Sequence, residues 1–193
     1  MHKLSKKIIL GSGSPRRREL LSGLDLEFTL DTGNSFEESV PEGARPEDVP
    51  MLMALGKSHG FHRPLEDNEL LITADTVVII DGCVIGKPHG REDAAAMLRR
   101  LSGRTHTVVS AVCFRDACGE WSLKDSTEVS FAPLSEEEIN YYIDKYKPYD
   151  KAGAYGIQEW IGYVAIRGVK GSFYTVMGFP VDLVWAELKK YSL

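Results

Sequence analysis

The sequence has few cysteines and no cysteine pair with metal or redox spacing. Its three cysteines, Cys83, Cys113 and Cys118, are spread over 193 residues without a CxxC motif. A small secreted scaffold held by disulfides would need more cysteines, in even number. The first residues also hold too short an apolar run for a secretory signal peptide. We therefore expect reduced thiols in a cytoplasmic protein.

Long apolar runs and an excess of positive charge are absent as well. No run approaches the length of about 20 apolar residues that a membrane-spanning helix needs. The net charge is -5 at pH 7, which argues against a broad basic surface for long nucleic acids but leaves room for a local positive pocket. With 43% hydrophobic residues, the chain can bury a core, and we expect one domain over residues 1–193.

Several familiar site motifs are missing too. The sequence contains neither the P-loop GxxxxGK[ST] nor the dinucleotide motif GxGxxG, and no serine lies in a GxSxG elbow. Its histidines lack a third ligand at clear spacing, which argues against a zinc site. They are His2, His59, His62, His89 and His106.

Strand-like and helical segments alternate along the chain. Strands are expected at residues 8–10, in LLIT and VVII with a break near Asp75, in THTVVSAVCFRD and STEVSFAPL, and in YVAIRG and SFYTVMG. A hairpin is expected at Asp81-Gly82. Helices are expected from Pro15, around 49–61, in REDAAAMLRRLSG up to Gly103, in EEEINYYIDKY behind a Ser135/Glu138 capping box, and from about Val181. This interleaving predicts an α/β fold with a mixed sheet and helices on its faces.

The segment GSGSPRRR joins a strand to a helix through small residues. Ser14 suits the helix cap and the following proline suits the first helical position, so backbone N–H groups and the helix dipole can face an anion. Arg16, Arg17 and Arg18 oppose the dipole there unless something negative binds. We interpret the segment as a phosphate site; the alternative is a capped helix with a solvated basic turn.

Asp75 lies between two apolar runs, where an ionised carboxylate is costly without a metal, a cation or several hydrogen bonds. The alternative is a strand end at which Asp75 bonds to nearby backbone amides. Glu37 and Glu38, in a polar loop, are candidates to join Asp75 around a hard cation such as Mg²⁺ or Mn²⁺, although a glutamate pair in a loop is more often simply solvated.

Two lysines and one glutamine complete the candidates. Lys57 and Lys87 are able to neutralise phosphate charge, but isolated lysines are commonly just surface residues. Gln158 ends the glycine-rich segment DKAGAYGIQ, whose small residues allow a flat ligand to approach the backbone. Its amide presents a donor and an acceptor together, which matches the edge of a pyrimidine base. A plain turn is the alternative interpretation.

Taken together, several segments resemble the Maf family of nucleotide pyrophosphatases, in the right order and over nearly the whole chain. They are GSGSPRRRELL, ADTVV, GKP, MLRRLSGRTHTVVSAV, SEEEI, DKAGAYGIQ and VMGFP. The resemblance implies a fold like that of the inosine triphosphatases, with an elongated mixed sheet flanked by helices and two lobes with a central cleft. It also implies hydrolysis of a nucleoside triphosphate to monophosphate and pyrophosphate, with a divalent metal cation.

The resemblance also implies roles for single residues. Asp75 is similar to the family's proton acceptor, and GIQ at Gln158 is similar to the branch that prefers dTTP and UTP. Arg16, Thr76 and Gln158 match positions that tune substrate choice, whereas Glu37, Lys57 and Lys87 match positions around metal and phosphate.

Two rival functions fit the same segments. A nucleotidyltransferase also places a glycine-rich, arginine-ended phosphate loop after its first strand. A nucleotide-binding regulator of cell division would bind without turnover. The expected partner is a small nucleotide rather than a long nucleic acid or a membrane, and a homodimer is compatible with the sequence.

Overall fold

The structure is a computed structural model that describes residues 3–193, and within it the chain divides into two compact units. The first unit contains residues 3–75, Ser110–Asp125 and Gly178–Leu193. The second contains Thr76–Val109 and Ser126–Met177. The first point at which the chain passes from one unit to the other falls directly after Asp75.

A mixed β-sheet forms the framework, as the sequence predicts. Its strand order is β2-β1-β3-β5-β6-β7, with β4 paired to β3. β1 is parallel to both β2 and β3, whereas β4 is antiparallel to β3 and β7 is antiparallel to β6. The strands are β1 (Lys7–Leu10), β2 (Phe28–Leu30), β3 (Glu69–Ile80), β4 (Cys83–Ile85), β5 (Thr105–Arg115), β6 (Glu120–Phe131) and β7 (Ile166–Lys170).

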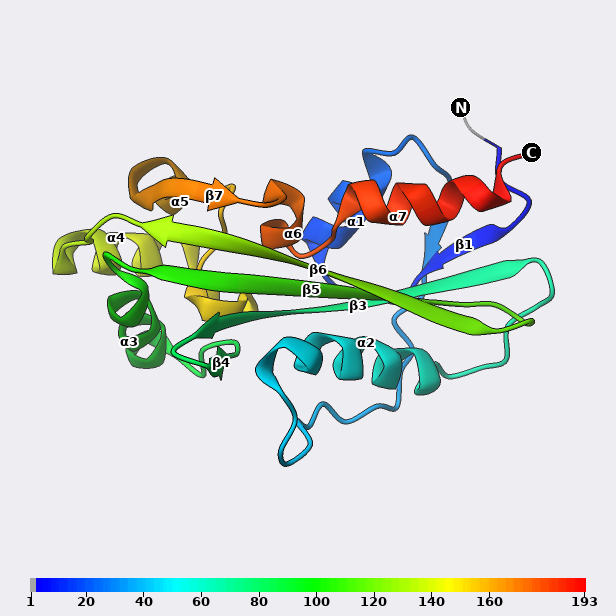
Figure 1. The fold of residues 1–193 in the computed structure, drawn as a ribbon, viewed down its shortest axis with the longest axis horizontal. Helices are drawn as coiled ribbons and strands as arrows, with labels where there is room; N and C mark the ends of the chain where they lie inside the picture. The colour runs from blue at the N-terminus through cyan, green and yellow to red at the C-terminus, as the bar shows by residue number, and fades with distance from the viewer. Residues whose placement is uncertain (1–2) are drawn as a thin grey trace. The chain divides into compact units, whose positions relative to one another are not determined.

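In the first unit, helices cover both faces of the sheet. α1 (Pro15–Ser22) and α7 (Val181–Leu188) lie on one face and α2 (Val49–His59) lies on the other (Figure 1). Because parallel strands covered on both faces have no solvent side, they read as continuous apolar runs. Residues 8–10 of β1 and 70–72 of β3 are accordingly buried throughout.

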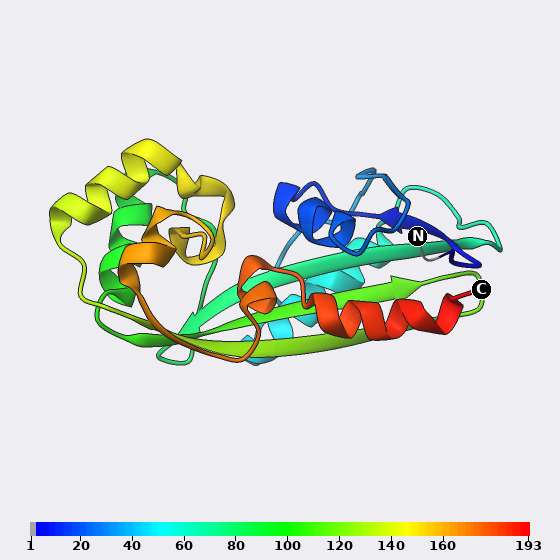
Figure 2. The ribbon, with the colours of Figure 1, turned by 90° about the horizontal axis from the view of Figure 1, so that it is seen from above.

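In the second unit, α3 (Arg91–Leu101) packs against α4 (Glu136–Tyr146), as Figure 2 shows. The predicted capping box begins α4: the backbone N–H of Glu138 donates to Ser135 Oγ at 3.2 Å, and the N–H of Ser135 donates to Glu138 Oε2 at 2.7 Å. The second unit also contains α5 (Trp160–Ala165) and α6 (Phe173–Met177), and short 3₁₀ turns occur in both units.

The predicted break in the strand at Asp75 is wrong. β3 runs without interruption from Glu69 to Ile80, with Asp75 and Thr76 half-buried in its middle. The strand continues because a cation on a neighbouring helix compensates the carboxylate, as described below. The hairpin at Asp81-Gly82 is confirmed: φ is 55° and 69° at the two residues, as a type I′ turn requires.

The prediction for SFYTVMG is also wrong, because Phe173–Met177 forms α6 rather than a strand. Thr127 accepts a hydrogen bond from the N–H of Ser172 at 2.9 Å and donates one to its carbonyl at 3.1 Å. Gly171 turns the chain there with φ 130°. In YVAIRG, only the residues from Ile166 onward form the strand β7. Short apolar runs do not distinguish strand from helix by their pattern alone.

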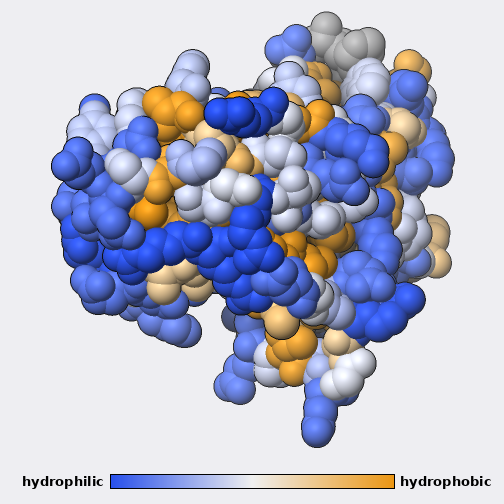
Figure 3. All heavy atoms as spheres, turned by 60° about the vertical axis from the view of Figure 1, so that its left-hand side comes forward, coloured by the Kyte–Doolittle hydropathy of each residue, from blue (hydrophilic) through white to orange (hydrophobic). Residues whose placement is uncertain are grey.

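The surface in Figure 3 is mostly hydrophilic, with apolar residues in small separate patches. Among the described residues, no helix combines the length and the apolar character needed to cross a membrane. All three cysteines are free thiols; Cys113 is buried, and burial raises the pKa of its thiol to about 11.

Candidate functional site

Lys57 lies at the centre of a charged cluster in the first unit. Its Nζ is 2.6 Å from Oδ1 of Asp75 and 2.9 Å from Oε1 of Glu38. The lysine comes from the last turn of α2, Asp75 from β3, and Glu38 from the loop that precedes α2. The side chains of Lys57 and Asp75 are only 17% and 14% exposed, so solvent and salt screen their attraction less than at the open surface.

The predicted phosphate segment lies in the same unit. Ser14 occupies the N-cap position of α1, but its side chain makes no capping hydrogen bond. Pro15 occupies the start of the helix, as predicted. An uncapped helix start of this kind keeps backbone N–H groups available for an anion.

Arg17 ties this segment to two other parts of the first unit. Its guanidinium donates to the carbonyl of Ala74 at 2.8 Å, to the carbonyl of Gly178 at 3.0 Å and to Ser12 Oγ at 3.3 Å. Ala74 directly precedes Asp75, so Arg17 fixes the backbone at the candidate catalytic residue. Burial lowers the pKa of Arg17, while the negative charge of Asp75 acts in the opposite direction. The structure thus gives Arg17 an anchoring role, and phosphate binding by it stays a prediction.

Arg16 adds positive charge to the same cluster. The positive charge of Arg16 lowers the pKa of Arg17, and the negative charge of Glu38 raises it. Of the predicted residues, the structure brings Lys57 and Asp75 into contact, and it bonds Arg17 to the backbone directly before Asp75. Glu37 is exposed, and it is its neighbour Glu38 that contacts Lys57.

In the second unit, Gln158 follows a tightly folded turn. Its Oε1 is buried and accepts no hydrogen bond from the described residues. A buried amide oxygen without a donor is costly, so a ligand N–H is a physical reason for its position. Thr76 follows Asp75 in β3, and exposed Lys87 follows β4.

A buried polar network supports the turn before Gln158. Tyr142 Oη accepts a hydrogen bond from the N–H of Gly156 at 3.0 Å and donates to the carboxylate of Glu159. Lys151 Nζ lies 3.2 Å from Glu159 Oε1 and 2.7 Å from Asp150 Oδ1. Because Tyr142 and Lys151 are buried, this network fixes the backbone on both sides of Gln158.

Two carboxylates of the first unit are candidate ligands for a hard divalent cation. Among residues 3–193, no group of three or more His, Cys, Asp or Glu side chains is placed to hold a metal ion. Asp75 and Glu38, however, are two carboxylates that already share one cation, Lys57. Mg²⁺ is commonly held by one or two carboxylates together with substrate phosphates and water. The residues therefore fit a cation that binds with its phosphate ligand.

The residue pattern did not distinguish Glu38 from Glu37, and the family resemblance selected Glu37, whereas the structure places Glu38 against Lys57. The sequence also gave no sign of the anchoring bonds of Arg17. Both glutamates lie in an irregular loop without hydrophobic periodicity, so no pattern indicates which of the two faces Lys57. The backbone acceptors of Arg17 come from Ala74 and Gly178, and a motif of side chains cannot reveal them.

A lysine between two carboxylates and an arginine-rich helix start thus occur together in the first unit of this mixed α/β fold. Comparison with known families is more specific: the family model described as Maf-like protein matches residues 7–191. The chain belongs to the Maf-like protein family.

Three curated relatives are similar along nearly the whole chain, and each is named dTTP/UTP pyrophosphatase. The relative from Porphyromonas gingivalis is 54% identical over 96% of this chain and 94% of its own length. The relative from Phocaeicola vulgatus is 50% identical over 95% of both chains, and that from Bacteroides thetaiotaomicron is 47% identical over 95% of both. Among solved structures, the Ham1 protein of Staphylococcus aureus matches with a TM-score of 0.45 and 13% identity, over 66% of this chain and 72% of that one.

Proposed function

We propose that this protein hydrolyses dTTP and UTP to the nucleoside monophosphate and pyrophosphate. The observation that carries the proposal is the convergence of Asp75 and Glu38 on the ammonium of Lys57. Three relatives with 47–54% identity named dTTP/UTP pyrophosphatase support the choice of substrate. The match over residues 7–191 supports one functional domain.

In this mechanism, Asp75 accepts the proton of the water whose attack breaks the bond between the α- and β-phosphates. Lys57 holds the carboxylate in place and offsets negative charge on the phosphate oxygens. Ser14 and Arg16, at the start of α1, bind phosphate oxygens together with the helix N–H groups. A divalent cation, Mg²⁺ or Mn²⁺, held by Asp75 with Glu38 or Glu37, would supply further charge neutralisation on the phosphates.

Of the three residues proposed to set substrate selectivity, Gln158 and Thr76 lie in the second unit and Arg16 lies in the first. Gln158 donates to and accepts from the edge of the pyrimidine base, since its buried Oε1 needs a donor. Thr76 and Arg16 tune the same choice, and Lys87 neutralises phosphate charge. A cytoplasmic location and a homodimer belong to the same proposal.

The test is to incubate the protein with single nucleoside triphosphates and Mg²⁺ or Mn²⁺ and to identify the products. Monophosphate and pyrophosphate from dTTP and UTP are expected. Asp75→Asn should lower turnover by a factor on the order of hundreds without changing the melting temperature by more than a few degrees. Asp144→Asn is a matched control, because Asp144 is an exposed aspartate on α4 that pairs with Arg91.

Other products would indicate the rival functions. A requirement for an added sugar phosphate would indicate a nucleotidyltransferase. Nucleotide binding without any product would indicate a regulator. Unchanged turnover in Asp75→Asn would remove Asp75 from the mechanism.

A further inference from the structure

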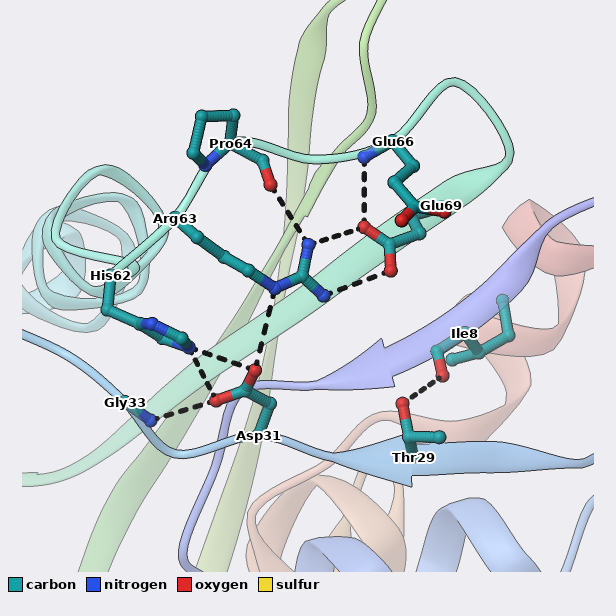
Figure 4. Close-up of polar contacts among 9 residues, drawn as sticks. All are labelled: Ile8, Thr29, Asp31, Gly33, His62, Arg63, Pro64, Glu66 and Glu69. Atoms are coloured by element: carbon teal, nitrogen blue, oxygen red, sulfur yellow. Dashed lines mark hydrogen bonds and ion pairs between the residues drawn. The ribbon is translucent and has the colours of Figure 1, made fainter.

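Glu38 lies in a segment with no strand or helix to hold it, and the structure shows how the segment is fixed instead. We call residues 31–38 the carboxylate loop, since they lead from the end of β2 to Glu38. At its start, Asp31 contacts Nε2 of His62 through both carboxylate oxygens, each at 3.0 Å. Figure 4 shows this pair beside Arg63, whose guanidinium reaches Asp31 at 4.0 Å and Glu69 at 2.7 Å. The loop is therefore anchored to the connection between α2 and β3.

Asn34 provides a second anchor at the end of α2. Its Nδ2 donates to the carbonyl of Lys57 at 2.5 Å, and its Oδ1 accepts from the N–H of Phe36 at 2.8 Å. The N–H of Ser35 donates to the carbonyl of Gly60 at 2.9 Å. These bonds satisfy carbonyls that the end of a helix leaves without partners.

Phe36 occupies a notch left by two glycines: its ring lies against Gly56 of α2, and its Cβ and backbone lie against Gly60, the residue that follows the helix. A Cβ on Gly56 would lie 2.3 Å from the ring, and one on Gly60 would lie 2.7 Å from Cβ of Phe36. Gly56 lies inside the helix, where glycine costs roughly 0.5–1 kcal/mol relative to alanine. The close approach of Phe36 is the physical reason for a glycine at that position.

We propose that Phe36, seated on Gly56 and Gly60, is a positioning residue that sets Glu38 against Lys57. Asn34 bonds the carbonyl of Lys57, and Glu38 pairs with its ammonium, so the carboxylate loop contacts both ends of one residue. Phe36 lies between Asn34 and Glu38 in the sequence, and its ring packs against Gly56, the residue before Lys57. Loss of the ring frees the backbone at Glu38 while the His62 anchor at the far end of the loop stays. The inference rests on the proposed function, because it gives Glu38 a role through Lys57.

The test is a double-mutant cycle between Phe36→Ala and Glu38→Gln, read by kcat/KM for dTTP. We expect Phe36→Ala to lower kcat/KM by about 10- to 100-fold, since displacement of a positioned group by about 1 Å has effects of this size. In the Glu38→Gln background the same change should lower kcat/KM by less than about 3-fold, because Phe36 acts through Glu38. Equal losses in both backgrounds would overturn the proposal, and so would full activity of Phe36→Ala.

Additional variants separate positioning from stability. Phe36→Leu keeps an apolar side chain in the notch and should retain most of the activity, whereas Gly56→Ala should reduce it despite a better helix propensity. Val40→Ala is the matched control, because Val40 is an apolar residue of the same connection and is 56% exposed. A Gly56→Ala variant with wild-type activity would contradict the notch.

Hydrogen exchange, which does not depend on catalysis, tests the role of Phe36 separately from the proposed pyrophosphatase activity. Hydrogen exchange at residues 36–40 should rise in Phe36→Ala and stay unchanged in Val40→Ala. If the wild-type protein makes no pyrophosphate but this exchange rises, the proposed function fails and the anchoring role stands. If the wild-type protein is active and the cycle is additive, only the positioning role fails.

Discussion

The ammonium of Lys57 lies 2.6 Å from Oδ1 of Asp75 and so joins the last turn of α2 to the middle of β3. This contact accounts for an aspartate between the apolar runs of the strand. A buried or half-buried carboxylate is stable in its charged form when a cation and hydrogen bonds replace the lost water. The pair therefore serves the fold and, in the proposed reaction, holds the proton acceptor in place.

Lys57→Met should lower kcat/KM for dTTP on the order of 100-fold, because it leaves the carboxylates of Glu38 and Asp75 facing each other without a cation. Steady-state kinetics with a thermal melt of the same sample checks this expectation. Lys124→Met is the matched control, since Lys124 pairs with Asp48 at the surface of the same unit. Equal kinetic losses in the two variants would show that charge removal in general, rather than this contact, is responsible.

Elements with a strong local signal were predictable from the sequence. The Asp81-Gly82 hairpin and the Ser135/Glu138 capping box depend on local backbone chemistry, and both are confirmed. The break at Asp75 was wrongly predicted because the compensating cation lies 18 residues away in the sequence. Local propensity gives way when a tertiary partner satisfies the polar group.

The candidate site shows the same limit. The family resemblance picked out Asp75 and Lys57, and the structure brings the two side chains together. The packing of Phe36 could not be predicted, because it depends on Gly56 inside α2 and on Gly60 directly after it, and glycines there merely indicate a weak helix. The sequence does not show which side chain packs against a glycine.

Gln158→Glu should raise the KM for dTTP and UTP by about 10-fold or more. A carboxylate accepts but does not donate, so it cannot match a base edge that offers an N–H beside a carbonyl. Kinetics with UTP, dTTP and GTP checks the change in preference. Asn140→Asp, on half-buried Asn140 of α4, is the matched amide-to-acid control. An unchanged preference in Gln158→Glu would remove Gln158 from base recognition.

Glu159→Gln should lower the free energy of unfolding by about 2 kcal/mol, because it leaves buried Lys151 with Asp150 as its one remaining charge partner among the described residues. Denaturant unfolding measures this effect. Glu136→Gln, which breaks an exposed pair with Arg99, should cost under about 1 kcal/mol. Comparable losses would mean that burial adds nothing to the Lys151 pair.

His106 should make the protein less stable as the pH falls below about 6.5. Its Nε2 lies 2.7 Å from Tyr155 Oη, its Nδ1 is buried without a partner among the described residues, and burial lowers its pKa to about 4. The folded state therefore keeps His106 neutral, while the unfolded chain, with an ordinary pKa near 6.5, takes up a proton as the pH falls.

The direction in which stability changes with pH follows from this difference in bound protons between the folded and unfolded states. Stability is complete above about pH 6.5 and decreases until the folded protein also protonates near pH 4. Between pH 6.5 and 5.0 the loss should be about 2 kcal/mol. This window lies above the range in which the carboxylates with lowered pKa, such as Asp81 and Glu69, titrate in either state.

The double variant His106→Phe/Tyr155→Phe replaces both polar partners by apolar rings and should remove this part of the pH dependence. Urea unfolding of both proteins at pH 6.5 and 5.0 measures the difference, and parallel losses in the two would show that another group carries it.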